Sequence, residues 1–226
     1  MDNLFGELRF GSRRRLRGTA FEAAAEYTGR WGWAVTVGTG TTRADGRCTC
    51  QAAHCAAPGL HQGLGPAHTV DPATGAGAAD LNRLRGGETA LLLPTGRAFD
   101  VLDVPAQPGL QALVRLERMG TQVGPVLGLP TGRLLFFVAP GAAQRLPELL
   151  YRMGWDDTTL DLACHGEGDY VAAPPTTLGP LGPTRWLRRP CRDSAACPPE
   201  ARLLLGTIAY ACHRTRERTA EPAWTA

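Results

Sequence analysis

The sequence predicts an α+β fold in which a mixed sheet is flanked by helices. Short apolar, strand-like segments alternate along the chain with segments of helical periodicity. The composition, 43% hydrophobic and 20% charged residues, is typical of a soluble globular domain, and 226 residues can bury one full core. We therefore expect one domain over residues 19–213, preceded by a basic arm (1–18) and followed by a polar tail (214–226).

The expected helices begin and end at residues with known capping preferences. Thr19-Ala-Phe-Glu22 is a capping-box sequence, and glycines at 29 and 32 end this first helix. Pro147 is suited to the first position of another helix, which runs to about Met153. Further helices are expected at 79–85, 110–119 and 200–213. The apolar positions expected to face inward are Leu110, Leu113, Val114 and Leu116 in the second of these and Leu203, Leu204, Ile208, Ala211 and Cys212 in the third.

Apolar segments bounded by Gly and Pro predict the strands. Turn residues Pro130-Thr-Gly-Arg133 join two such segments into an expected β-hairpin. A second strand pair is expected to form around the turn 165–168, before a Pro-rich loop at 174–190. The expected strands are 33–37, 89–93, 98–104, 123–129, 134–138, 160–163 and 170–173.

No apolar run approaches the ~20 residues of a membrane span, so no membrane partner is expected. The early Arg run is not followed by the apolar region of a secretory signal. These features predict a cytoplasmic protein.

All 24 basic residues are Arg, and the net charge of +3 is too small to indicate nucleic-acid binding alone. Arg binds phosphate in a bidentate way, so clusters of Arg are candidate phosphate contacts. A solvated charged face is the alternative interpretation. The two clusters contain Arg13, Arg14 and Arg15 at the start and Arg185, Arg188 and Arg189 late in the chain.

The loop at about 40–66 carries the most specific local pattern. Cys48, Cys50, Cys55 and His61 follow the spacing C-x-C-x4-C-x5-H, which offers the four soft or borderline ligands of a tetrahedral zinc site. Four protein ligands close the coordination shell, so the expected role of zinc is structural, with His54 as a reserve ligand. The alternative is fortuitous cysteines in a loop. Cys164-His165 is interpreted as a coincidence, because strand neighbours face opposite sides.

Asp100 and Asp103 lie in the buried strand at 98–104. A carboxylate at such a strand is either a site residue or a structural cap, because it needs a partner. Their spacing of three places them on opposite faces of a regular strand. Asp103 and Asp161 each lie beside apolar strand residues, and Asp100 or Asp169 could join them. Two-metal phosphoryl transfer needs two or three such acids, converging from neighbouring strands.

An ordered set of motifs resembles a known family. In chain order it comprises C-A-A-P-G-L-H, L-P-T-G before F-D-V-L-D-V, P-T-G-R-x-x-F-F-V-A-P, L-D-L and G-x-Y-V-A-A-P-P. The set resembles the bifunctional DNA primase–polymerase N-terminal domain of the archaeo-eukaryotic primase superfamily, in the stand-alone form of high-GC actinobacteria. The resemblance covers roughly residues 19–213.

The resemblance implies template-dependent nucleotide polymerisation with Mg or Mn. Its pattern is a D-h-D/E pair, a His on the next hairpin and a later Asp. Asp103 matches the first acid and Asp161 the later one, but Pro105 replaces the second acid and Leu134 the His. Losing a carboxylate and an imidazole is expected to lower the rate by several orders of magnitude.

Three functions are therefore considered. The first is a degenerate primase–polymerase-like pseudoenzyme that binds DNA or nucleotides, with Arg133 and the two Arg clusters as phosphate contacts. The second is an active nucleotidyltransferase that uses Asp100 with Asp103 and Asp161. The third is a non-enzymatic scaffold that binds a protein partner through the zinc loop or the Pro-rich loop.

Overall fold

The computed structural model describes residues 19–42, 45–50, 52, 54–55, 58–59, 61, 69–74, 89–155 and 159–220. Arg13, Arg14, Arg15 and the helix expected at 79–85 lie outside these residues. The described elements, in chain order, are α1 (Ala20–Trp31), β1 (Val35–Thr39), β2 (Thr69–Val70), β3 (Thr89–Pro94), β4 (Asp100–Pro105), α2 (Ala106–Arg118), β5 (Val126–Leu129), β6 (Arg133–Val138), α3 (Ala142–Arg152), β7 (Ala163–His165), β8 (Tyr170–Ala172), the 3-10 turn Gly179–Leu181, β9 (Arg185–Arg188), α4 (Arg192–Ala196) and α5 (Ala201–Ala220).

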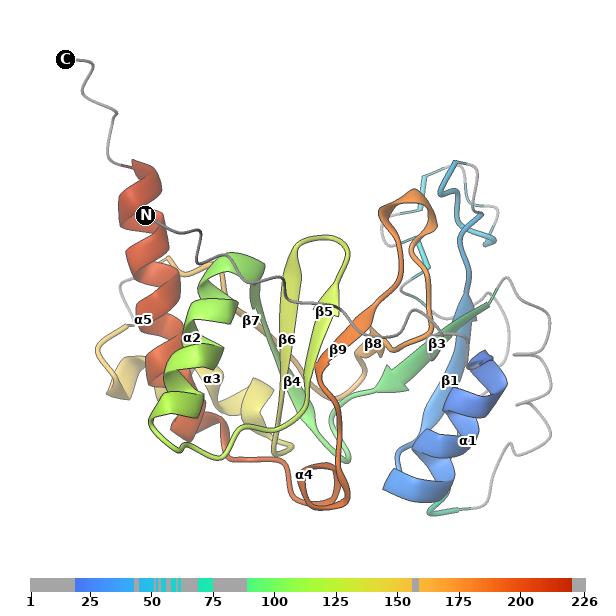
Figure 1. Cartoon of the computed structure of the whole chain (residues 1–226), viewed down its shortest axis with the longest axis horizontal. Helices are drawn as coiled ribbons and strands as arrows, with labels where there is room; N and C mark the ends of the chain where they lie inside the picture. Colours follow the sequence, from blue (N-terminus) through green and yellow to red (C-terminus); the bar gives the residue numbers. More distant parts are fainter. Residues whose placement is uncertain are drawn as a thin grey trace, which may run out of the picture.

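The strands form two antiparallel sheets (Figure 1). One has five strands in the order β7-β4-β6-β5-β9, and the other has four in the order β2-β1-β3-β8. The α+β class is confirmed, but the single mixed sheet was wrong. The expected pairing of 160–163 with 170–173 was also wrong, because β7 pairs with β4 and β8 pairs with β3. The turn between them carries the chain from one sheet to the other.

Alternate residues of β4 enter two different cores, as the twofold repeat of a strand requires. Leu102 and Val104 pack with β6, α2, α3 and α5 on one face of the five-stranded sheet. Val101 packs on the other face, between the two sheets and against α1. Aromatic rings fill this second core, where Trp33 and Phe137 stack with centroids 5.6 Å apart. The position of a polar residue in β4 therefore determines which face of the sheet its side chain occupies.

The first helix begins and ends as its capping residues predicted. Thr19 is the N-cap of α1, both hydrogen bonds of the capping box with Glu22 are present, and Gly32 caps the other end in the left-handed conformation at φ 68°. The predicted hairpin is confirmed as β5 and β6, paired from Val126↔Phe136 to Leu129↔Arg133.

Two helices begin earlier than expected. α2 starts at Ala106, so that Pro108 falls in its first turn, where a missing N–H costs nothing. α3 starts at Ala142 and contains Pro147 in its interior. Its start is fixed by a bond outside the helix, from the Ala143 N–H to Asp100 of β4.

Three side chains that were expected to face inward are exposed instead. They are Leu110 and Val114 of α2, each 46% exposed, and Leu203 of α5, which is 47% exposed. Leu205 takes the buried position in α5. This helix also extends to Ala220, beyond the predicted end at His213. No helix in the described part of the chain combines the length and the hydropathy that crossing a bilayer requires.

Candidate functional site

Asp103 lies on the face of β4 that looks toward the four-stranded sheet. Its partners in the two neighbouring strands are Leu135 of β6 and Ala163 of β7. Arg133, two residues before Leu135, shares this face and reaches Asp103 diagonally. Its Nε donates to Asp103 Oδ1 at 2.7 Å, and a terminal nitrogen donates to the Asp103 carbonyl at 3.2 Å. The side chain of Asp103 is 16% exposed, so this ion pair is largely shielded from water.

The same guanidinium binds Asp161, which lies just before β7. Nη1 of Arg133 donates to Asp161 Oδ1 at 2.7 Å. Partial burial of Arg133 acts to lower its pKa, but the hydrogen bonds to Asp161 and Asp103 outweigh burial and raise the pKa above its ordinary value. The two acids matched to the family pattern are therefore brought together, with a permanent cation between them.

His165 completes this cluster, and the sequence interpretation missed it. β7 pairs with β4 so that His165 lies opposite Val101, on the Asp103 face. Its Nε2 is 3.1 Å from Asp103 Oδ2, and its Nδ1 is 3.7 Å from Asp169 Oδ2. The hydrogen bond with Asp103 raises the pKa of His165 above its ordinary value, against the opposing effect of burial.

A signal for His165 was present in the sequence. Positions 161, 163 and 165 share one face of an extended chain, so a strand that presents Asp161 also presents His165. Cys164 and His165 were predicted to face opposite sides of the strand and not to form a thiol–imidazole pair. Cys164 does pack against the helix-covered core, on the side away from His165. His165 instead contacts Asp103 directly, a contact that the sequence interpretation did not consider.

Asp100 lies on the opposite face of β4, as its spacing from Asp103 predicted. It is fully buried, and its Oδ2 accepts the backbone N–H of Ala143 at 2.8 Å, in the first turn of α3. Gly141, the N-cap residue of α3, contributes no side-chain bond, so Asp100 supplies the missing cap. This geometry supports the structural-cap interpretation and keeps Asp100 away from Asp103.

Pro105 and Leu134 mark the two departures from the family pattern. Pro105 shares the Asp103 face, pairs with Arg133 in the ladder, and is the N-cap residue of α2. Leu134 is 3% exposed and packs in the core beneath the helices. Because it lies on the other face of β6, the hairpin side chains nearest Asp103 are Arg133 and Leu135 instead.

The Asp103 face as it stands does not fit a divalent-metal centre. Such a centre needs two or three oxygen ligands free to converge on the ion. Here Arg133 bridges Asp103 and Asp161, and His165 takes the second oxygen of Asp103. Among the described residues, the metal-ligating side chains that converge in a group of three or more are those of the Cys/His loop and not these acids.

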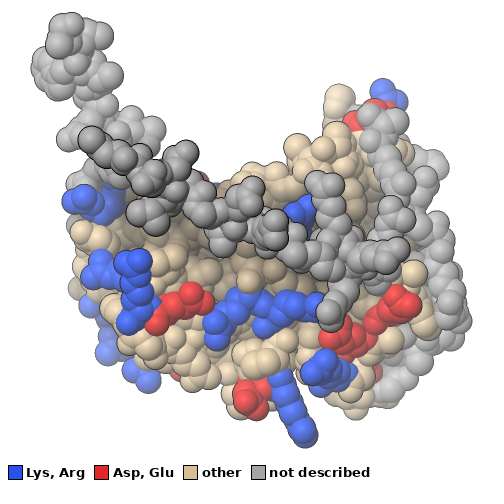
Figure 2. All heavy atoms as spheres, viewed as in Figure 1, with Lys and Arg blue, Asp and Glu red and all other residues tan. Residues whose placement is uncertain are grey.

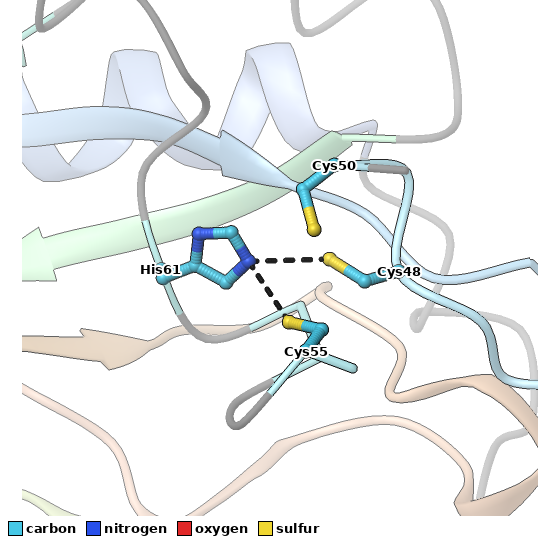
Figure 3. A group of neighbouring side chains, drawn as sticks. All are labelled: Cys48, Cys50, Cys55 and His61. Carbon is cyan, nitrogen blue, oxygen red and sulfur yellow. Dashed lines mark hydrogen bonds between the residues drawn. The ribbon is translucent and has the colours of Figure 1, made fainter. Parts of the chain in front are cut away.

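Cys48, Cys50, Cys55 and His61 do converge, as the spacing predicted (Figure 3). Their ligand atoms all lie within 4.8 Å of one another. Nε2 of His61 is 3.3 Å from Cys48 Sγ and 3.2 Å from Cys55 Sγ. Zinc–ligand bonds of 2.0–2.3 Å in a tetrahedron give ligand separations of about 3.5 Å, close to these distances. The donor set fits one structural zinc ion. His54 is exposed and not part of the group.

The metal-ligand group is built onto the end of β1. The backbone N–H and the hydroxyl of Thr39 both bind the carbonyl of His61, at 3.0 and 3.1 Å. Burial acts to raise the pKa of Cys48, but hydrogen bonds from Thr39 and from Cys50 and Gly59 outweigh it and lower the pKa to about 6. Thr41, which precedes the ligands in the same loop, donates to the Thr177 carbonyl, so this loop also contacts the Pro-rich loop.

The late arginines lie on and beside β9. Figure 2 shows a band of Arg side chains over this region, with acidic side chains at both ends of the band. Arg188 binds Glu117 at 3.2 Å and the Val123 carbonyl at 3.1 Å, and Arg189 is 3.5 Å from Glu26. Arg185 is exposed. Part of this positive charge is therefore already neutralised by the protein's own acids.

Comparison with protein families gives one match. Residues 24–200 match the model of the bifunctional DNA primase/polymerase, N-terminal domain. Neither the comparison with curated proteins nor that with solved structures found a match. The matched region contains the Cys/His group, all strands of both sheets and the Asp103 cluster. Because the match covers well over half of the sequence, the chain belongs to the bifunctional DNA primase/polymerase N-terminal family.

Proposed function

We propose that this chain is a catalytically degenerate member of its family that binds nucleic acid or nucleotide without efficient polymerisation. The contact of Arg133 with both Asp103 and Asp161, each at 2.7 Å, carries the proposal. The guanidinium of Arg133 neutralises the two carboxylates, as a divalent ion would do in a metal centre. An arginine cannot bridge the attacking and leaving oxygens as a metal pair does, so it preserves the fold of the site without its chemistry.

The two replaced positions support the same conclusion. Pro105 provides no carboxylate beside Asp103, and Leu134 is committed to the core. His165 does not restore a metal site, because its Nε2 is bound to Asp103. Exposed arginines on β9 provide the phosphate contacts of the proposed binding function, and the expected zinc ion stabilises the loop that contacts the Pro-rich segment.

Primer extension with Mn²⁺ tests the loss of catalysis. The wild-type chain is expected to show no extension above that of an Asp103→Asn variant, which keeps the shape of the side chain and removes its charge. Extension that is present in the wild type and absent from both Asp103→Asn and Asp161→Asn variants would instead establish an active nucleotidyltransferase.

Salt-dependent affinity tests the binding function. Fluorescence anisotropy with a labelled primer–template should give a dissociation constant that rises steeply with salt, since each phosphate contact releases counterions. Replacing Arg185 and Arg189 by Gln should weaken binding and reduce the slope. Arg30→Gln is the matched control, because Arg30 is an exposed α1 residue that pairs with Glu26. Absence of DNA and nucleotide binding, together with DNA-independent capture of a protein, would favour the scaffold function.

A further inference from the structure

A cavity between α2 and α5 lies outside the Asp103 cluster. Figure 1 shows these two helices side by side, on the helix-covered side of the five-stranded sheet. Ala112 and Ala211 lie among its lining residues and are almost completely buried, at 1% and 7% exposure. Because both side chains are single methyl groups, the helices leave a space of about 210 Å³ above them. Asp103 faces the other side of the sheet, so the two sites are separate.

The residues around this space are cationic, polar and aromatic. Arg115 and Arg214 come from the two helices, and none of the described residues that line the cavity is acidic. Neither guanidinium is paired with a carboxylate in the described part of the chain, in contrast to Arg133 and Arg188. Two unneutralised guanidinium groups at one cavity favour an anion, and phosphate is the anion whose geometry the guanidinium matches best.

Tyr210 adds a second recognition element. Tyr210 is 44% exposed and lines the cavity, and the guanidinium carbon of Arg115 lies 5.5 Å from the centroid of its ring. Nucleic-acid bases stack on aromatic rings such as this phenol, while their phosphates bind neighbouring arginines. Gln111 and Thr207 place an amide and a hydroxyl at the same cavity, where they can hydrogen-bond a sugar or base.

We propose that the α2–α5 cavity binds a phosphate group together with its attached base, from either a free nucleotide or a nucleotide of a single strand. The guanidinium groups of Arg115 and Arg214 hold the phosphate, and the Tyr210 ring stacks on the base. This site adds to the proposed function without depending on it, since it uses no residue of the Asp103 cluster or of β9.

Fluorescence anisotropy with the full chain and a fluorescein-labelled oligo-dT strand tests the proposal, with unlabelled dTMP and inorganic phosphate as competitors. The double variant Arg115→Gln/Arg214→Gln is expected to bind at least about tenfold more weakly, with a salt slope lower by about 1.4, which corresponds to two phosphate contacts on a single strand. The control is Arg118→Gln, which removes one charge from α2 outside the cavity lining and should change affinity less than about twofold.

The competitors separate the two sources of the ligand. If dTMP displaces the strand from the wild type but not from the double variant, the site binds free nucleotides. If the strand binds and dTMP does not compete, the site binds nucleic acid. A Tyr210→Leu variant should weaken the strand or dTMP and leave inorganic phosphate unchanged. The proposal is overturned if the double variant and Arg118→Gln bind the strand with equal affinity. Circular dichroism of each variant confirms that it is folded. Loss of affinity in the Arg185/Arg189 variant alone would place binding on β9 and not in this cavity.

Discussion

Nε2 of His165 lies 3.1 Å from Oδ2 of Asp103, while Oδ1 of the same carboxylate accepts the Nε–H of Arg133 at 2.7 Å. Both oxygens of Asp103 are therefore bound by basic side chains, one from each neighbouring strand of the five-stranded sheet. Asp103 therefore links β6, β4 and β7 through one network of charged side chains.

Removing Arg133 should destabilise the protein. An Arg133→Met variant is expected to lower the free energy of unfolding by about 1–2 kcal/mol, because a mostly buried carboxylate loses its strongest partner. Urea denaturation at neutral pH measures the change. Arg185→Met is the control, since this exposed residue on β9 should contribute less than about 0.5 kcal/mol. Equal effects of the two substitutions would argue against a structural role for the Arg133 network.

The same substitution tests whether the arginine takes the place of a metal ion. Without Arg133, the carboxylates of Asp103 and Asp161 are free to bind Mn²⁺, so millimolar Mn²⁺ should raise the melting temperature of Arg133→Met and leave that of the wild type unchanged. An Arg133→Met/Asp161→Asn double variant should lose the effect. Equal Mn²⁺ responses of the wild type and Arg133→Met would contradict this explanation.

His165 predicts a pH dependence of stability. Its pKa is raised in the folded protein, chiefly by Asp103, so the protonated form is favoured by folding. The resulting stabilisation is fully present below the ordinary histidine pKa of about 6.5 and is lost as the pH rises through the folded-state pKa. His165→Gln should therefore destabilise the chain more at pH 5.5 than at pH 8.5 in urea denaturation. An equal effect at both values would show that the contribution of the imidazole does not depend on its charge.

Zinc should be present and should stabilise the chain. We expect about one equivalent of zinc per purified chain, and Cys50→Ser should reduce this content and lower the melting temperature by several degrees. Elemental analysis and thermal denaturation measure the two effects. Cys191→Ser is the control, because Cys191 is an exposed cysteine outside the ligand group. Zinc content well below one equivalent in the wild type would contradict the assignment.

Asp100 should matter for stability and not for binding. Asp100→Ala removes the acceptor of the Ala143 N–H and is expected to cost about 1–2 kcal/mol, the usual range for a lost helix cap. Asp100→Asn keeps an acceptor oxygen and should cost less. Both variants should bind nucleic acid as the wild type does. A binding defect in the Asn variant would assign Asp100 to the functional face instead.

Local signals predicted much of the fold. The capping box at Thr19, the turn at Pro130–Arg133 and the spacing of Cys48, Cys50, Cys55 and His61 each depend on residues close in sequence, and each was confirmed. The opposite facing of Asp100 and Asp103 followed from the twofold period of a strand.

The failures have a common physical cause. Apolar strands specify that they pair, but the choice of partner depends on the whole chain, so β7 and β8 were assigned to each other and not to β4 and β3. The contact of His165 with Asp103 depends on this pairing and was missed with it. Likewise, Pro147 predicted a helix start on local grounds, whereas the start of α3 is fixed by Asp100, which is distant in sequence.

Pro105 has a consequence for what an acidic residue at its position would meet. It is the N-cap residue of α2, with ψ 145° and no side-chain bond to the helix, and it lies opposite Arg133. An aspartate at an N-cap is generally favourable, because it accepts free N–H groups of the first turn. Restoring the acid at this position would therefore meet no stability barrier from α2, and a carboxylate there would have a cation beside it. The folding energy of α2 therefore does not disfavour a carboxylate at position 105.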